Sequence, residues 1–219
     1  AAAQQRLDAG ERLPMLGVPI AIKDDVDVAG EFTCLGSSAF DRAADTDAEV
    51  VRRLRQAGAV IMGKTAVPEM MLWPFTETVA FGATHNPWDL AYTPGGSSGG
   101  SGAAVAAGLA PMALGSDGAG SIRIPSSWCG LFGLKPQRDR VPIGPHDDAW
   151  CGLSVNGPMS RTVEDAALFL DVTHTGKAPR GGFVKAAARK PRRLRIALSA
   201  KLPPTMVARV GPAQQRALD

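Results

Sequence analysis

The stretch Met15-Leu16-Gly17-Val18-Pro19-Ile20-Ala21-Ile22-Lys23 is a short apolar run that ends in a lysine. A run of this length without a polar interruption is typical of a strand that is buried on both faces of a sheet. The simplest interpretation is therefore a buried strand with Lys23 at its exit.

Helix-like and strand-like patterns alternate along the rest of the chain. A buried strand is expected at 59–62 and a further strand at 112–116, and helices are expected at 50–57, 103–107 and 164–172. The 103–107 segment consists of small residues, so its helix can pack very closely against a neighbour. This alternation predicts an α/β sandwich with a mixed, largely parallel central sheet.

The composition excludes several classes of protein. With 219 residues, 45% of them hydrophobic and 21% charged, the chain is neither disordered nor a collagen or coiled coil. No apolar run approaches the roughly 20 residues of a membrane span. The three cysteines form no Cys-x-x-Cys pair, which favours reduced thiols and a cytoplasmic location. We expect Cys129 and Cys151 to be buried small residues rather than nucleophiles.

The net charge of +3 conceals an uneven distribution. Residues 1–176 contain 13 Lys/Arg and 20 Asp/Glu, a net charge of −7, whereas residues 177–209 contain ten Lys/Arg and no acid. The basic stretch lacks the interleaved aromatic residues of a single-strand nucleic-acid surface. We therefore interpret it as solvated and expect no nucleic-acid partner.

This division suggests the domain organisation. We expect a folded core at 1–176, a basic linker at 177–194, and the start of the remaining part of the same domain at 195–219. The last segment has a strand-like pattern at 195–198 and a helix-like pattern at 211–218. Because the chain begins without an initiator Met and ends abruptly, we expect it to be an excerpt of a longer one.

Two short patterns match known sequence motifs, but the secondary structure that each motif needs around it is not indicated here. Residues 58–65 fit the P-loop expression, but the four middle residues form a strand pattern rather than a phosphate-binding loop. Residues 95–99 fit the esterase nucleophile elbow, but no apolar strand precedes them. His146 and His174 are available to such a site, yet lone histidines in polar surroundings are typical of the surface.

A lysine and two serine-bearing glycine loops form a more informative combination. Lys23 leaves its strand, one loop covers 95–102, and Ser121 ends a second loop. Serine needs a base to act as a nucleophile, and a lysine kept neutral by burial can supply one, directly or through a bridging hydroxyl. The amides of 118–121 could stabilise an oxyanion. Turn and packing glycines around a buried ion pair remain the alternative.

Five ordered segments resemble the amidase signature family. They are 17–24 with its lysine strand, 58–65, the two signature halves at 94–101 and 115–123, and 128–136. The resemblance covers most of the chain and implies that family's α/β/α sandwich, incomplete in this chain. It also implies an amidase without a cofactor or metal.

The resemblance further implies a Ser–cis-Ser–Lys triad for hydrolysis of a carboxamide C–N bond. Ser121 would be the nucleophile, Ser97 the bridging serine after a cis bond to Gly96, and Lys23 the base. The implied oxyanion hole consists of Gly118, Ala119 and Gly120. The residues implied as structural support are Ser98, Asp117 and Arg123, with the Asp–Arg pair stabilising the loop.

Two further features bear on the site. Carboxylates at Asp24 and Asp25 would raise the pKa of the adjacent lysine, although alternation along an extended backbone sends Asp24 to the opposite face. Residues 70–73 follow the 58–65 segment, where members of the family often line the acyl pocket. In this cluster, which begins with Met70, the candidate substrate-binding residues for an apolar or aryl amide are Met71, Leu72 and Trp73, with plain core packing as the open alternative.

We expect a small-molecule amide as the partner and no membrane, while a homodimer remains open. The family also includes the subunit that releases ammonia for tRNA-dependent amidation. That subunit, or a catalytically silent fragment, is the alternative function. Residues 137–151 differ from that subunit's usual continuation, which favours a stand-alone amidase.

Overall fold

The computed structural model describes residues 2–145, 149–191, 193–195, 197, 211–212 and 215–216. The chain divides into two compact units, residues 1–188 and residues 189–219. The elements described below all lie in the first unit. The strand predicted at 195–198 and the helix predicted at 211–218 extend onto residues outside the described part.

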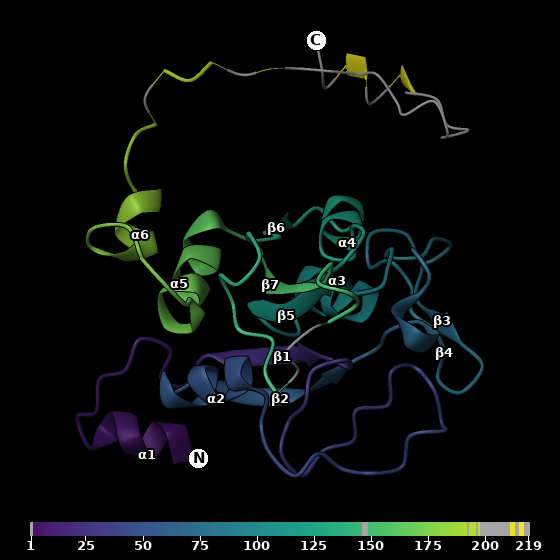
Figure 1. The fold of residues 1–219 in the computed structure, drawn as a ribbon, viewed down its shortest axis with the longest axis horizontal. Coiled ribbons are helices and arrows are strands. Elements are labelled where there is room, and N and C mark those ends of the chain that lie inside the picture. Colours follow the sequence, from purple (N-terminus) through teal and green to yellow (C-terminus); the bar gives the residue numbers. More distant parts are fainter. Residues whose placement is uncertain are drawn as a thin grey trace. The chain divides into compact units, whose positions relative to one another are not determined.

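A mixed sheet with the strand order β2-β1-β5-β7-β6 forms the centre of the first unit (Figure 1). The strands are β1 Pro19–Lys23, β2 Val60–Thr65, β5 Met112–Asp117, β6 Phe132–Gly133 and β7 Val155–Ser160. Strand β1 pairs in parallel with β2 and β5, whereas β7 pairs antiparallel with both β5 and β6. Because β7 alone opposes its neighbours in the described sheet, the predicted mixed, largely parallel sheet is confirmed.

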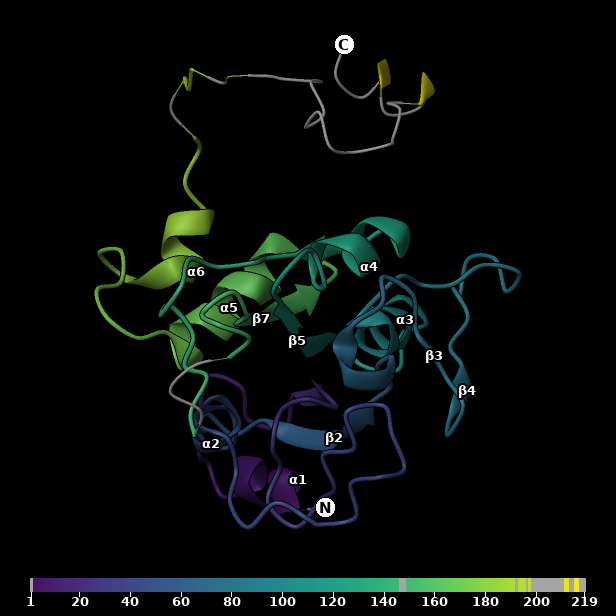
Figure 2. The ribbon, with the colours of Figure 1, turned by 45° about the vertical axis from the view of Figure 1, so that its right-hand side comes forward.

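Helices cover both faces of this sheet, as Figure 2 shows for α5 and α3 on either side of β5. These helices are α2 Glu49–Gln56 and α5 Val163–Thr173 on one face and α3 Gly99–Ala106 on the other. Ile20 and Ile22 of β1 pack in the cluster that includes α2 and α5, whereas Ala21 packs against Val105 of α3. Side chains alternate across a strand, so one strand contributes to two cores. The result is the predicted α/β/α sandwich.

Smaller elements complete the unit. They are α1 Ala2–Asp8, the 3₁₀ helix η1 Glu69–Met71, the antiparallel pair β3 Glu77–Thr78 and β4 Gly82–Ala83, α4 Arg123–Trp128 and α6 Gly182–Ala187. Helix α6 lies within the stretch that we expected to be a linker. Asp171 of α5 accepts hydrogen bonds from the amides of Phe183 (2.6 Å) and Val184 (3.0 Å). Residues 177–188 therefore belong to the same unit as the core.

The structure departs from the sequence interpretation at several elements. Strand β1 begins at Pro19 because Gly17 turns the chain with a φ of 80°. Strand β2 lies at the edge of the described sheet, and Met62 is 56% exposed, so this strand is not buried as we expected. Strand β7 was not predicted at all. Within the described part, no helix is long and apolar enough to cross a bilayer.

Candidate active site

Lys23 stands at the carboxyl end of β1, in the middle of the sheet, with no exposed surface. Its Nζ atom donates hydrogen bonds to the hydroxyl oxygens of Ser97 (2.8 Å) and Ser116 (2.7 Å). Burial lowers the pKa of Lys23 below its ordinary value, while the carboxylates of Asp25 and Asp117 oppose that effect. The environment therefore favours a neutral amine, the form that can accept a proton.

Ser97 lies in the loop that leads into α3 and is almost completely buried. The peptide bond between Gly96 and Ser97 is cis, as the resemblance implies. A Cβ atom at Gly96 would lie 2.6 Å from the carbonyl oxygen of Trp73 and 2.7 Å from the amide nitrogen of Phe75. Because backbone atoms cannot swing aside as a flexible side chain can, only glycine fits at this position.

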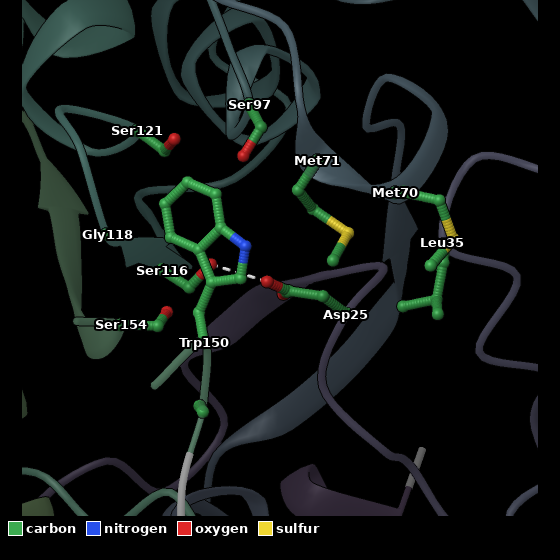
Figure 3. A pocket seen from close by; sticks show the side chains of 11 residues that line it. Asp25, Leu35, Met70, Met71, Ser97, Ser116, Gly118, Ser121, Trp150 and Ser154 are labelled. Carbon is green, nitrogen blue, oxygen red and sulfur yellow. Dashed lines mark hydrogen bonds between the residues drawn. The ribbon is translucent and has the colours of Figure 1, made fainter. Parts of the chain in front are cut away.

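Ser121 follows β5 in the second glycine loop and lines the same cavity as Ser97. Figure 3 shows the hydroxyl groups of both serines on the same side of that cavity. The Ser121 hydroxyl forms no hydrogen bond with another described residue. The structure thus brings together Lys23, Ser97 and Ser121, the three residues that the resemblance implies as a triad.

Ser98 connects the two serine loops. Its amide donates to the carbonyl oxygen of Ser121 (3.2 Å), and its hydroxyl donates to the carbonyl oxygen of Ser116 (3.1 Å). The side chain is completely buried. These contacts agree with the predicted supporting position of Ser98.

Asp117 organises the loop that carries Ser121. Its buried carboxylate accepts hydrogen bonds from the amides of Gly120 (2.8 Å) and Ile122 (3.1 Å) and from Arg123 Nε (3.0 Å) and Nη2 (2.9 Å). Burial raises the pKa of Asp117, but these hydrogen bonds outweigh burial, and the pKa lies below its ordinary value. Asp117 and Arg123 thus form the expected loop-stabilising pair.

The predicted oxyanion hole needs one correction. The amide of Gly120 is occupied by Asp117, so it does not point at an oxyanion in this structure. The amides of Gly118, Ala119 and Ser121 donate to no other described residue. A hole built from this loop would therefore use the amide of Ser121 in place of that of Gly120.

Asp25 and Ser116 were not predicted as site residues. The hydroxyl of Ser116 donates to Oδ2 of Asp25, and that carboxylate oxygen lies 3.4 Å from Lys23 Nζ. Asp24 points away and pairs with Lys64 at 3.1 Å. The period of two along β1 does not extend to these residues, because β1 ends at Lys23 and Asp24 and Asp25 lie in the turn that follows it.

The cavity has a volume of about 280 Å³. Of the three predicted substrate-binding residues, Met71 lines it, whereas Leu72 and Trp73 are 61% and 55% exposed and lie outside it. Trp73 instead stacks on Phe75, with ring centroids 5.6 Å apart. Met70, from the same predicted cluster, also lines the cavity, and the apolar wall residues that the sequence did not reveal are Leu35 and Trp150. Leu35 and Trp150 come from segments far from the signature, so no local pattern marks them.

The remaining candidates lie apart from this chemistry. Residues 60–65 form β2, so the P-loop pattern is a strand here, as the sequence indicated. Cys129 is buried, which raises its pKa to about 11, whereas Cys151 is exposed, contrary to our expectation. His174 bonds through Nδ1 to the carbonyl oxygen of Leu170 (2.9 Å), and His146 lies outside the described residues.

Known proteins resemble this chain along most of its length. The amidase family matches residues 1–219. The protein AmiB2 of Mycobacterium tuberculosis, assigned as an amidase, is 72% identical over 210 residues, which are 96% of this chain and 46% of that protein. The chain thus spans about half the length of the curated relatives it matches.

Two further relatives represent different activities. The A subunit of a glutamyl-tRNA(Gln) amidotransferase from Desulforapulum autotrophicum is 47% identical over 172 residues, covering 78% of this chain and 35% of that subunit. A solved structure of 6-aminohexanoate cyclic dimer hydrolase has a TM-score of 0.79 and 40% identity, over 88% of this chain and 43% of that one.

Proposed function

The chain belongs to the amidase family, and from that premise we propose that the protein hydrolyses the C–N bond of a small carboxamide through an acyl-Ser121 intermediate. Ser121 is the nucleophile, Ser97 relays the proton and Lys23 is the base. The products are a carboxylic acid and an amine or ammonia. The reaction as proposed needs no metal or cofactor.

The hydrogen bond between Lys23 Nζ and Ser97 Oγ, 2.8 Å long and fully buried, is the observation that carries this proposal. Packing alone does not explain a buried lysine beside a serine, because burying a charged amine costs free energy. The same amine kept neutral beside a hydroxyl is a general base. Ser121 lines the same cavity and supplies a hydroxyl that needs such a base.

The first half-reaction acylates the enzyme. Ser121 Oγ attacks the carbonyl carbon and forms a C–O bond, while its proton passes to Ser97 Oγ and the proton of Ser97 passes to neutral Lys23. The carbonyl electrons move to oxygen, and the amides of Gly118, Ala119 and Ser121 stabilise the resulting oxyanion.

The tetrahedral intermediate then collapses. Its C–N bond breaks. The leaving nitrogen takes a proton from the hydroxyl of Ser97, and Lys23 donates its proton to Ser97. Lys23 is neutral again when the amine or ammonia departs. In the second half-reaction water repeats the route of Ser121: it attacks the acyl carbon, and the Ser97–Lys23 pair takes its proton and returns it to Ser121 as the acid leaves.

Substitution of the nucleophile tests the proposal. Full-length protein with Ser121→Ala should hydrolyse a panel of aliphatic and aryl amides at least a thousandfold more slowly than the parent and should not be labelled by a fluorophosphonate. Ser127→Ala provides the matched control, because Ser127 is exposed on α4. If Ser121→Ala hydrolyses the amides as fast as the parent and Ser127→Ala do, Ser121 is not the nucleophile.

An amidotransferase subunit is the second candidate, because a subunit of that kind is 47% identical to this chain. Such a subunit would release ammonia within a complex that acts on a tRNA-linked substrate. Purified protein that hydrolyses simple amides without a partner supports the stand-alone amidase. Copurification with a second protein, together with hydrolysis only in its presence, supports the subunit.

A further inference from the structure

The catalytic cavity contains one charged side chain among the described residues that line it, Asp25. Its Oδ2 atom accepts the hydrogen bond of Ser116 and faces Lys23. Its Oδ1 atom is buried and has no hydrogen-bond partner among the described residues. A buried carboxylate oxygen without a partner is unfavourable. The side chain of Asp25 lines the cavity and is 11% exposed, so rotation of its carboxylate would bring this oxygen to a donor from a ligand.

The charges around the cavity do not cancel when Lys23 is ready to act as a base. Lys23 is then neutral and no longer balances Asp25. The other nearby carboxylate, Asp117, is compensated by Arg123 through two hydrogen bonds. The cavity therefore presents one uncompensated negative charge to an incoming substrate.

A second cavity of about 570 Å³ extends this negative surface. Asp25 and Leu35 line both cavities, so the two meet at these residues. The second cavity adds the carboxylates of Asp27, Asp41 and Asp45 and one cation, Arg42, which pairs with Asp45 at 2.6 Å. Acidic side chains thus outnumber basic ones along the described surface next to the catalytic cavity.

The remaining walls of the catalytic cavity suit a hydrocarbon chain. Leu35, Met70, Met71 and Trp150 supply apolar surface, and Figure 3 shows the indole of Trp150 facing the carboxylate of Asp25 across the cavity. A ligand with an alkyl body and a positive end would satisfy both kinds of surface.

We propose that Asp25 binds an ammonium group of the substrate, so that the protein favours amides of amino-substituted aliphatic acids over neutral amides of the same shape. This inference rests on the proposed amidase function. It assigns the unpartnered oxygen of Asp25 to substrate recognition, in addition to the contact of that side chain with Lys23.

A matched pair of substrates tests the preference. The parent protein, in its full-length form, should give a kcat/KM for 5-aminopentanamide at least tenfold above that for hexanamide, which has a methyl group in place of the ammonium. Asp25→Asn should reduce this ratio about tenfold. The ratio is the readout because any general loss of catalysis in Asp25→Asn affects both substrates. Glu31→Gln, which removes an equal charge outside both cavities, should leave the ratio unchanged.

A binding measurement separates this inference from the amidase function itself. Protein with Ser121→Ala should bind n-butylammonium chloride in a calorimeter, and the double variant with Asp25→Asn should bind it about tenfold more weakly. Equal binding by the two proteins, or a parent that prefers hexanamide, overturns the inference. If the parent hydrolyses neither amide, the proposed function fails, and the calorimetric comparison still decides the role of Asp25.

Discussion

The Nζ atom of Lys23 lies 3.4 Å from Oδ2 of Asp25, and the hydroxyl of Ser116 contacts both groups. Asp24 and Asp25 lie in the turn that follows β1, which the amide of Val26 closes by donating to the carbonyl oxygen of Lys23 (3.1 Å). In this turn Asp25 lies beside Lys23, whereas Asp24 pairs with Lys64. Two opposing effects therefore set the proton affinity of Lys23. Burial favours the neutral amine, and the neighbouring carboxylate favours the charged one.

Removing the amine of Lys23 should remove the proposed general base. Lys23→Met keeps nearly the same volume in the buried site, so we expect the fold to persist while kcat/KM falls by about 10²–10⁴, the usual contribution of a general base. Amide hydrolysis at pH 8 and thermal unfolding measure the two effects. Lys177→Met, on an exposed side chain, is the control. Activity within tenfold of the parent in Lys23→Met would rule out Lys23 as the base.

The pH dependence of hydrolysis should report the environment of Lys23. The base acts only when neutral, so kcat/KM should rise with pH and reach half its plateau below 10.5, the ordinary pKa of a lysine, because burial lowers that pKa. Asp25 acts in the opposite direction, so Asp25→Asn should shift the rising limb to lower pH.

The profile is measured with hexanamide, whose neutral chain avoids any direct contact with a charge at residue 25. Glu31→Gln serves as the control and should leave the limb in place. If the rising limb moves to higher pH in Asp25→Asn, the carboxylate of Asp25 does not raise the pKa of Lys23.

The stability of the loop that carries Ser121 should depend more on Asp117 than on Arg123. Asp117→Ala removes the buried acceptor of several hydrogen bonds and should lower the free energy of unfolding by about 3–5 kcal/mol. Arg123→Ala leaves the amide hydrogen bonds intact, and its side chain is 55% exposed, so we expect a loss of about 1 kcal/mol. Urea unfolding compares the two variants, and the reverse order of stability would refute this account.

The same carboxylate predicts a pH effect on stability. Because the pKa of Asp117 is lowered in the folded state, its contribution is present above its ordinary pKa of 3.8 and is lost as the pH falls through the lower native value. The difference in stability between the parent and Asp117→Ala should therefore shrink on acidification. A difference that stays constant down to pH 2 would contradict this linkage.

Gly100 in α3 should not tolerate alanine. A Cβ atom there would lie 2.4 Å from the amide nitrogen and 2.5 Å from the carbonyl oxygen of Ala66. Alanine is the better helix former by about 1 kcal/mol, yet overpacking against backbone should cost about 3 kcal/mol and lower the unfolding midpoint. Gly102→Ala meets side-chain atoms of Pro125 and Met159 at 3.2–3.3 Å and should be milder. A Gly100→Ala protein as stable as Gly102→Ala would disprove the clash.

Strands β1 and β5 could be predicted from the sequence, whereas β7 could not. The first two are apolar runs, because both of their faces are buried. Strand β7 contains Asn156, Gly157 and Pro158, which are poor strand formers. A Cβ atom at Gly157 would lie 2.3 Å from the carbonyl oxygen of Leu134. Close packing between β7 and that neighbouring segment therefore selects residues that local propensity would reject.

The candidate site shows the same division. Lys23 at the end of an apolar run and serines within glycine loops are local features, and their types indicate a base and a nucleophile before any fold is known. The contact between Ser116 and Asp25 joins residues 91 positions apart, and no local pattern announces it. Trp150 likewise reaches the cavity from a segment well beyond the signature.

The sequence by itself determined the buried strands β1 and β5, the turns that require glycine and the identity of the reactive groups, because burial and backbone conformation leave a local imprint on residue type. Only the tertiary structure decided that the hydroxyl of Ser116 lies against both Lys23 and Asp25, residues 93 and 91 positions away in the chain. These relations depend on strand order and on distances of a few ångströms between segments far apart in the chain. The parallel pairing of β1 with β5 sets both of them.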